Sequence, residues 1–166
     1  MNKETIINNY LKTLNITDLN TLEDITKLIE AHTSTFAFSS MKVLLGDEIS
    51  LELEAIYDSL VVKRRGGYCF EHNKLMYEAL KENGFDVKFY LARVVNNQEG
   101  DEPQTHRFTI LTYEEKDYII DVGVGFRSPT LPILFSKEVT TTNLGIKYWV
   151  ETFEDEIFGL MSQESN

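Results

Sequence analysis

Apolar side chains recur at helical spacing in three stretches of the N-terminal part of the chain. The apolar positions of the first stretch are Ile6, Ile7, Tyr10, Leu11 and Leu14. The second stretch covers residues 18–30, with Thr17 as the predicted N-cap, and the third covers residues 49–62, with Ser50 in that role. Residues 32–47 are less regular, and this predicts a loop.

The hydrophobic period changes from helical to alternating near the middle of the chain. A helix that starts near Cys69 is predicted to end at Asn83–Gly84, because glycine commonly terminates helices. Alternation then predicts strands over 87–92, 105–113 and 118–122, separated by a polar loop at 96–103 and a turn at 114–117. Weaker signals predict strands over 146–150 and 152–158, before a polar tail at 162–166. Helices followed by antiparallel strands predict an α+β fold, with a helical subdomain over 1–84 and an antiparallel β subdomain over 85–166.

Composition narrows the class of protein. The chain has 166 residues, 42% hydrophobic and 26% charged, which is the balance of an ordinary globular protein. No apolar run is long enough to span a bilayer, and the N-terminus has no signal-peptide pattern. With one thiol and no export signal, we expect the protein to be cytoplasmic. A net charge of -11 disfavours non-specific binding to nucleic acid or to an anionic membrane.

Cys69 is the only cysteine of the chain, so it forms no intramolecular disulfide. Gly66 and Gly67 allow a tight turn just before it, and an amphipathic run follows. We therefore expect Cys69 at or near a helix N-terminus, where the macrodipole stabilises a thiolate, the nucleophilic form. Free cysteines are also often inert packing residues, so its partners decide between the two interpretations.

A cysteine nucleophile needs a base, and the base needs an orienting group. His106 lies on an apolar face of its predicted strand, and Asp121 interrupts an apolar run at the end of the next strand. A carboxylate there costs free energy unless it is paired, and an imidazolium is the available partner. With a turn at Glu115–Lys116, however, Asp121 would lie too far along the ladder to reach His106. The triad therefore requires another turn or a bend near Gly123.

The other two histidines compete for the role of base. His72 is three residues from Cys69 on the same predicted helix, and we interpret it as a poorly aimed surface residue. His32 lies near the predicted loop and has no evident acidic partner. Three histidines without further cysteines or an acidic cluster do not make a zinc site, so we expect no metal.

Residues 65–73 read Arg-Gly-Gly-Tyr-Cys-Phe-Glu-His-Asn, which resembles the R-G-G-[aromatic]-C-x-E-x-N signature of the arylamine N-acetyltransferase family. Thr105–His106 before an apolar strand, and the segment over 121–125, Asp-Val-Gly-Val-Gly, continue the family's order of motifs. The resemblance covers roughly residues 5–135.

The resemblance implies a xenobiotic-metabolising acyltransferase with a Cys-His-Asp triad. Cys69 would take the acetyl group of acetyl-CoA as a thioester, His106 would activate the thiol, and Asp121 would hold the imidazole. An arylamine or hydrazine would then attack the thioester, which gives ping-pong kinetics. The family positions implied for coenzyme approach and for the acceptor pocket are Thr105 for the former and Phe38, Tyr68 and Phe126 for the latter.

The chain also departs from the family pattern. The P-F-E-N segment reads Ala37-Phe38-Ser39-Ser40, and Val124 replaces the usual phenylalanine, so we expect an altered acceptor pocket. The family fold is a helical bundle followed by an antiparallel β-barrel, in a cysteine-protease-like arrangement. The resemblance implies a shortened member without the family's third α/β lobe, and the incomplete barrel is expected to favour self-association.

Two functional hypotheses remain open at this point. The chain is an active, shortened acetyltransferase, or it is a family remnant that is inactive, weakly hydrolytic or limited to binding other molecules. A cysteine protease or transglutaminase-like enzyme would share the nucleophile but not the motif around it.

Overall fold

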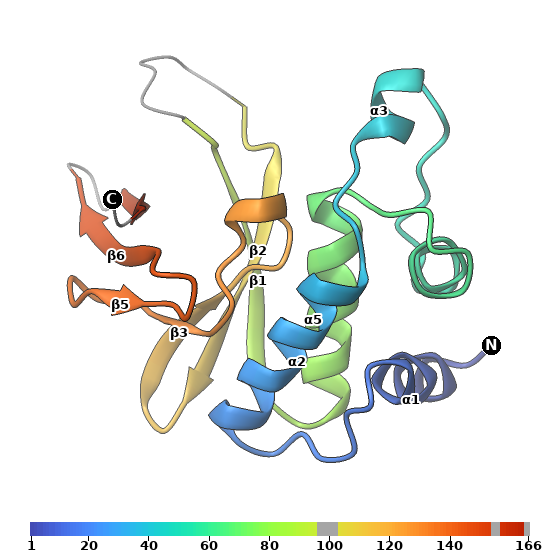
Figure 1. Cartoon of the computed structure of the whole chain (residues 1–166), viewed down its shortest axis with the longest axis horizontal. Helices are drawn as coiled ribbons and strands as arrows, with labels where there is room; N and C mark the ends of the chain where they lie inside the picture. Colours follow the sequence, from blue (N-terminus) through green and yellow to red (C-terminus); the bar gives the residue numbers. More distant parts are fainter. Residues whose placement is uncertain (96–102, 154–156, 165–166) are drawn as a thin grey trace.

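The computed structural model describes residues 1–95, 103–153 and 157–164, with helices first and antiparallel strands after them (Figure 1). The helices are α1 (Lys3–Thr13), α2 (Leu22–Thr35), α3 (Met41–Leu45), α4 (Leu53–Ile56), the π-helical η1 (Tyr57–Val62), α5 (Cys69–Glu82) and the short 3-10 helix η2 (Gly125–Arg127). The predicted α+β class is confirmed. The predicted loop over 96–103 lies outside the described residues except for Pro103.

Helix α2 begins later and ends later than the sequence pattern predicts. Its N-cap is Thr21, whose Oγ1 accepts a hydrogen bond from the Asp24 N–H at 3.2 Å while Asp24 Oδ2 accepts one from the Thr21 N–H at 3.1 Å. This reciprocal capping box starts the helix, so the predicted N-cap at Thr17 is wrong. The helix continues to Thr35, which places His32 on a helix and not in a loop.

The predicted helix over 49–62 is shorter and irregular. It begins at Leu53 as α4 and passes directly into η1. Ser50 does not cap it, because the Ser50 hydroxyl accepts from the Glu52 N–H at 3.2 Å, before the helix starts. The predicted loop over 32–47 is likewise wrong in part, since it contains the end of α2 and all of α3.

The strands form two sheets, in the orders β1-β2-β3-β4 and β5-β6-β7. The strands are β1 (Asp86–Ala92), β2 (His106–Tyr113), β3 (Lys116–Ile120), β4 (Ile133–Leu134), β5 (Thr140–Thr141), β6 (Lys147–Thr152) and β7 (Phe158–Gln163). Within the described residues both sheets are open, so the predicted barrel is not seen. Strand β7 starts where the strand predicted over 152–158 would end, and it extends into the predicted polar tail; residues 154–156 lie outside the described residues.

The hairpin between β2 and β3 fixes the register that the sequence left open. Glu114 and Glu115 have φ values of 49° and 60°, and Tyr113 pairs with Lys116. Positive φ at both central positions is the type I′ arrangement of a two-residue hairpin loop. The turn lies within the predicted segment 114–117, one position before the Glu115–Lys116 alternative that would have kept Asp121 out of reach of His106. Ile120 pairs with Thr109, so the next residue, Asp121, comes opposite Phe108 and within diagonal reach of His106.

The first sheet is covered on both faces. On one side a large apolar cluster joins the helices to Leu111, Ile120 and Val122. On the other side Ile119 and Ile133 pack against the second sheet through Tyr148 and Val150. Figure 1 shows this layering, with α2 and α5 on one side of the first sheet and β5 and β6 on the other. In the part of the chain that the structure describes, every helix is too short or too polar to cross a bilayer.

Candidate active site

The nucleophile candidate is the first residue of α5, as the sequence predicts. The turn before it is held by Glu71, whose Oε2 accepts from the Tyr68 N–H at 3.1 Å and whose Oε1 accepts from Lys42 Nζ at 3.1 Å. Glu71 is buried, so this pairing satisfies a charge that would otherwise be costly. The Cys69 thiol is partly exposed and donates to the Thr105 carbonyl at 3.5 Å. Cys69 is thus held at the helix N-terminus and next to the start of β2.

His106 and Asp121 are both buried and in direct contact, with Nε2 to Oδ2 at 2.6 Å. The side chain of Cys69 also hydrogen-bonds to His106. Because Nε2 is taken by Asp121, Nδ1 is the ring nitrogen left for the thiol. The structure therefore brings together the three residues predicted as a triad, from α5, from the start of β2 and from the end of β3.

Burial of the ring lowers the pKa of His106, but its hydrogen bonds to Asp121 and Cys69 and their charges outweigh this and raise it to about 10. A raised pKa in the folded state stabilises the fold fully below the unfolded value of 6.5, and this contribution is lost as the pH rises through about 10. The imidazole is therefore cationic at neutral pH.

We expect the stability advantage of the wild-type chain over His106→Asn to be largest below pH 6.5 and to shrink as the pH rises to about 10. The reason is that asparagine does not titrate, whereas His106 loses its proton in that interval. Urea unfolding of both proteins across the interval measures the difference. A difference that stays constant, or that grows with pH, would contradict the ion pair.

Asn73, the last position of the signature motif, was expected to satisfy backbone groups around the nucleophile turn, but the sequence analysis did not identify its partners. Its Nδ2 donates to Asp121 Oδ1 at 2.9 Å and to the Arg107 carbonyl, and its Oδ1 accepts from the Val122 N–H at 3.0 Å. One buried amide thus links α5, β2 and the segment after β3. The signals in the sequence are its place in the signature motif and its spacing of four residues from Cys69, which puts both on one helix face.

Gly123 lies against the nucleophile and its support. Its N–H donates to Asp121 Oδ1 at 2.9 Å. A Cβ at this position would come within 2.5 Å of Asn73 Nδ2 and 2.8 Å of Cys69 Cα. The chain can therefore pass this close to Cys69 only with glycine at position 123.

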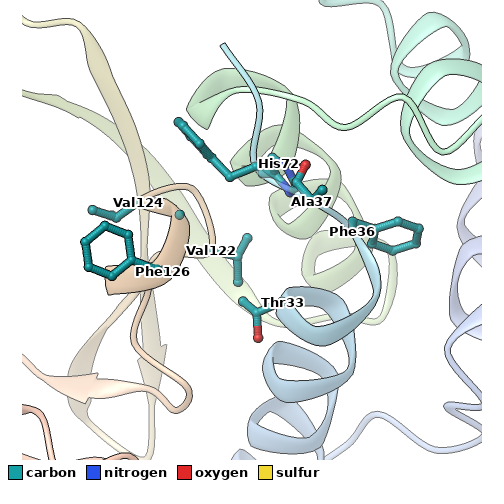
Figure 2. Close-up of a pocket in the computed structure, with 9 residues that line it drawn as sticks. Thr33, Phe36, Ala37, His72, Val122, Val124 and Phe126 are labelled. Atoms are coloured by element: carbon teal, nitrogen blue, oxygen red, sulfur yellow. Dashed lines mark hydrogen bonds between the residues drawn. The ribbon is translucent and has the colours of Figure 1, made fainter. Parts of the chain in front are cut away.

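A cavity of about 480 Å³ opens beside this cluster (Figure 2). Its lining is mainly apolar and comes from α2, the segment after it, α5 and the turn before and within η2: Thr33, Phe36, Ala37, Phe38, His72, Val122, Val124, Gly125 and Phe126. Val122 and Val124 of this lining flank Gly123, the residue that packs against Cys69.

Two of the three aromatic residues predicted for the acceptor pocket lie in this lining. Phe38 and Phe126 are both largely exposed toward solvent, at 44% and 82%. Tyr68 is not part of it and stacks instead on Phe70, with ring centroids 5.5 Å apart. Thr105 is exposed beside Cys69, and its contact with a coenzyme remains a prediction.

His72 is not a surface residue, contrary to the sequence interpretation: its exposed fraction is 1%. The helix face that carries it is covered by α2 and by the segment around Ala37, which a helical pattern alone does not reveal. His32 is fully buried as well and contacts His72 at 2.8 Å. Burial lowers the pKa of His72, against the pull of the Ala37 and Gly67 backbone and of Glu71. Burial and the neighbouring His72 lower the pKa of His32 well below its usual value.

Within the described ranges, no three His, Cys, Asp or Glu side chains gather in a way that could hold a metal ion. The site places a thiol, an imidazolium and a carboxylate next to one another in space, beside an apolar cavity.

Comparison with known proteins places this site in a family. Residues 21–165 match the sequence model of an N-acetyltransferase family. The arylamine N-acetyltransferase of Escherichia coli (strain K12) is 43% identical over 116 residues, which are 69% of this chain and 41% of that protein.

Solved structures agree with the sequence comparison. The arylamine N-acetyltransferase from Salmonella typhimurium superposes with a TM-score of 0.82 at 31% identity, over 95% of this chain and 62% of that one. The Mycobacterium marinum arylamine N-acetyltransferase in complex with CoA gives 0.83 at 32% identity, over 95% and 59%. The chain thus spans less than half the length of the curated relative and about three fifths of these structures. With the family's sequence model, its curated relatives and its solved structures all in agreement, the chain belongs to the arylamine N-acetyltransferase family.

Proposed function

We propose that this chain transfers an acetyl group from acetyl-CoA to an arylamine or hydrazine through a thioester on Cys69. The observation that carries the proposal is the contact of 2.6 Å between His106 and Asp121, with the Cys69 side chain hydrogen-bonded to the same imidazole. A base held by a buried carboxylate and aimed at a helix-terminal thiol is the arrangement that nucleophilic acyl transfer requires.

In the first half-reaction Cys69 enters with its proton already on His106 Nδ1, and the sulfur attacks the thioester carbonyl of acetyl-CoA. The Tyr68 N–H is engaged with Glu71, so the N–H groups of Cys69 and Phe70 in the first turn of α5 are the ones that would stabilise the oxyanion. As the carbonyl re-forms, the bond to the coenzyme sulfur breaks. The coenzyme leaves as a thiol with the proton from His106, and Cys69 keeps the acetyl group.

In the second half-reaction the acceptor occupies the apolar cavity between Phe38 and Phe126. Its amine nitrogen attacks the acetyl carbonyl and loses a proton to His106 Nδ1. The bond to Cys69 sulfur then breaks, and the proton stays on His106 Nδ1, which restores the starting state of the pair. Asp121 holds the ring through both transfers, while Asn73 and the Gly123 N–H hold Asp121.

A second candidate function is a binding module that keeps the triad but transfers slowly. It is favoured by apolar side chains of β7 that are open to solvent, Phe158 and Leu160, which would suit self-association.

The test is the intact mass of the protein after incubation with acetyl-CoA and no amine. We expect a single acetyl adduct that disappears when an arylamine or a hydrazine is added, because the thioester is formed and consumed in separate steps. p-Nitrophenyl acetate serves as a second donor that needs no coenzyme binding. An adduct from this ester but not from acetyl-CoA would favour the second candidate, and no adduct from either donor, with protein that is folded and has a free thiol, would contradict the nucleophile assignment.

A further inference from the structure

Three buried side chains form a continuous line of hydrogen bonds that the reaction above does not use. The Tyr10 hydroxyl contacts His32 Nδ1 at 2.7 Å, and His32 Nε2 contacts His72 Nδ1 at 2.8 Å. His72 Nε2 contacts the Ala37 carbonyl at 3.3 Å. We call these three side chains the histidine chain; it runs from α1 through α2 to α5, and none of its members is more than 1% exposed.

The Ala37 carbonyl, a hydrogen-bond acceptor at the end of the histidine chain, fixes which atom donates in each of its hydrogen bonds. A carbonyl oxygen only accepts, so the proton in the last contact is on His72 Nε2. In a neutral ring Nδ1 of His72 then accepts, which requires the proton of His32 on Nε2. Nδ1 of His32 in turn accepts from the Tyr10 hydroxyl, which therefore donates. Both imidazoles are neutral in this arrangement, in agreement with the lowering of both pKa values by burial.

The Ala37 carbonyl, at the end of the histidine chain, belongs to a residue that lines the cavity. It also accepts from the Gly67 N–H at 3.2 Å, and the Ser39 N–H donates to the Gly67 carbonyl at 2.7 Å, which ties this segment to the turn before Cys69. The ring of Phe38 stacks on that of His72, with an interplanar angle of 20°. Figure 2 shows Ala37 and His72 side by side at the cavity. The position of His72 thus bears directly on the Ala37–Phe38 wall.

We propose that His72 is a positioning residue for the acceptor half-reaction: the histidine chain fixes its Nε2–H tautomer, which holds the Ala37–Phe38 wall of the cavity in place beside Cys69. This inference rests on the proposed function. The contacts of His72 are to His32, to the Ala37 carbonyl and to the Phe38 ring, so we expect its effect on the fate of the acetyl group after Cys69 has received it. Water can reach the acetyl group without binding against the Ala37–Phe38 wall. The rate of hydrolysis is therefore the internal comparison for the rate of aminolysis.

The experiment loads Cys69 with p-nitrophenyl acetate and follows the acetyl-protein as it reacts with aniline or with water. For His72→Leu we expect the second-order rate constant of aminolysis to fall about tenfold, the scale on which displaced binding groups act, with acylation and hydrolysis within about twofold of wild type. His72→Gln restores most of the loss, because glutamine carries an N–H donor near the position of Nε2. Tyr10→Phe removes only the hydroxyl at the far end and is expected to lower aminolysis about threefold.

Thr26→Val is the matched control, because it removes a partly buried hydroxyl from the same helix as His32, one that bonds only to the Leu22 carbonyl at 3.0 Å. It should leave the ratio of aminolysis to hydrolysis unchanged. Equal losses in acylation, hydrolysis and aminolysis for His72→Leu, or a glutamine variant no better than the leucine variant, would overturn the proposal. If wild-type protein is not acylated at all, the proposed function fails; the Kd of aniline for wild type and His72→Leu, from NMR titration, then decides the role of the wall, and equal values overturn it.

Discussion

Replacement of Cys69 by serine is expected to abolish acetyl transfer while leaving the fold intact. The rate should fall about a thousandfold or more, the scale seen when a catalytic nucleophile is removed, and no acetyl adduct should form. The physical reason is that a hydroxyl is a far weaker acid than a thiol, so His106 cannot generate the same nucleophile. Stability should change little, because the substitution changes one atom at a partly exposed helix terminus.

The measurement combines intact mass with acetyl-CoA, steady-state transfer to an arylamine, and Tm. The informative control is Ser59→Ala, which removes a hydroxyl that accepts from Lys42 Nζ on the far side of Glu71 and has no contact with the triad. Transfer by the Cys69→Ser protein at a rate near wild type would remove Cys69 from the mechanism. An inactive protein with a strongly lowered Tm would instead show that the thiol has a structural role that its contacts do not indicate.

Gly123→Ala is expected to be the most damaging small substitution near the site. The new methyl group would lie 2.5 Å from Asn73 Nδ2 and 2.8 Å from Cys69 Cα, and neither neighbour is free to move. The amide of Asn73 is held by Asp121 and by the Arg107 carbonyl, and Cys69 Cα is helix backbone. We expect a loss of about 1–3 kcal/mol in the free energy of unfolding, typical of overpacking. Displacement of the nucleophile should lower acylation about a hundredfold.

Urea unfolding and acylation by p-nitrophenyl acetate measure the two effects separately. Gly159→Ala is the matched control, since its methyl group would also meet a neighbour at 2.8 Å, but that neighbour is the far end of the exposed Phe153 ring. The ring can swing away, so this variant should lose little stability and no activity. If Gly123→Ala behaves like Gly159→Ala, the close packing of residue 123 on Cys69 is wrong.

The overall pattern of elements was predictable because it is local. Helical spacing located α1 and α5, and alternation located β1 and β2, each from neighbouring residues alone. The start of α2 was missed because two overlapping capping signals were present, and the reciprocal pair of Thr21 and Asp24 prevailed over Thr17. The strand predicted over 146–150 is found as β6, but the one predicted over 152–158 was displaced, because aromatic and acidic residues there follow neither period.

The contact between His106 and Asp121 was predicted as a pairing but not as a geometry. It depends on the type I′ turn at Glu114–Glu115, which moves Asp121 two places closer to His106 along the ladder than a turn at Glu115–Lys116 would. Such turns are usually signalled by asparagine and glycine, and two glutamates carry no such signal. The contact between Asn73 and Asp121 was missed for a related reason, since the two residues are 48 positions apart.

By itself the sequence determined the α+β class, the place of Cys69 at the start of a helix, and membership in the arylamine N-acetyltransferase family, because periodicity, glycine turns and a contiguous motif are properties of neighbouring residues. Only the tertiary structure decided the hairpin register, the support of Asp121 by Asn73, and the burial of His32 and His72. These depend on which distant segment covers a given face: His72 is enclosed because α2, 40 positions earlier, packs over it. A helix shows in its own sequence that it has an apolar side, but the identity of its partner, and hence the charge state of a histidine between them, is set by the rest of the chain.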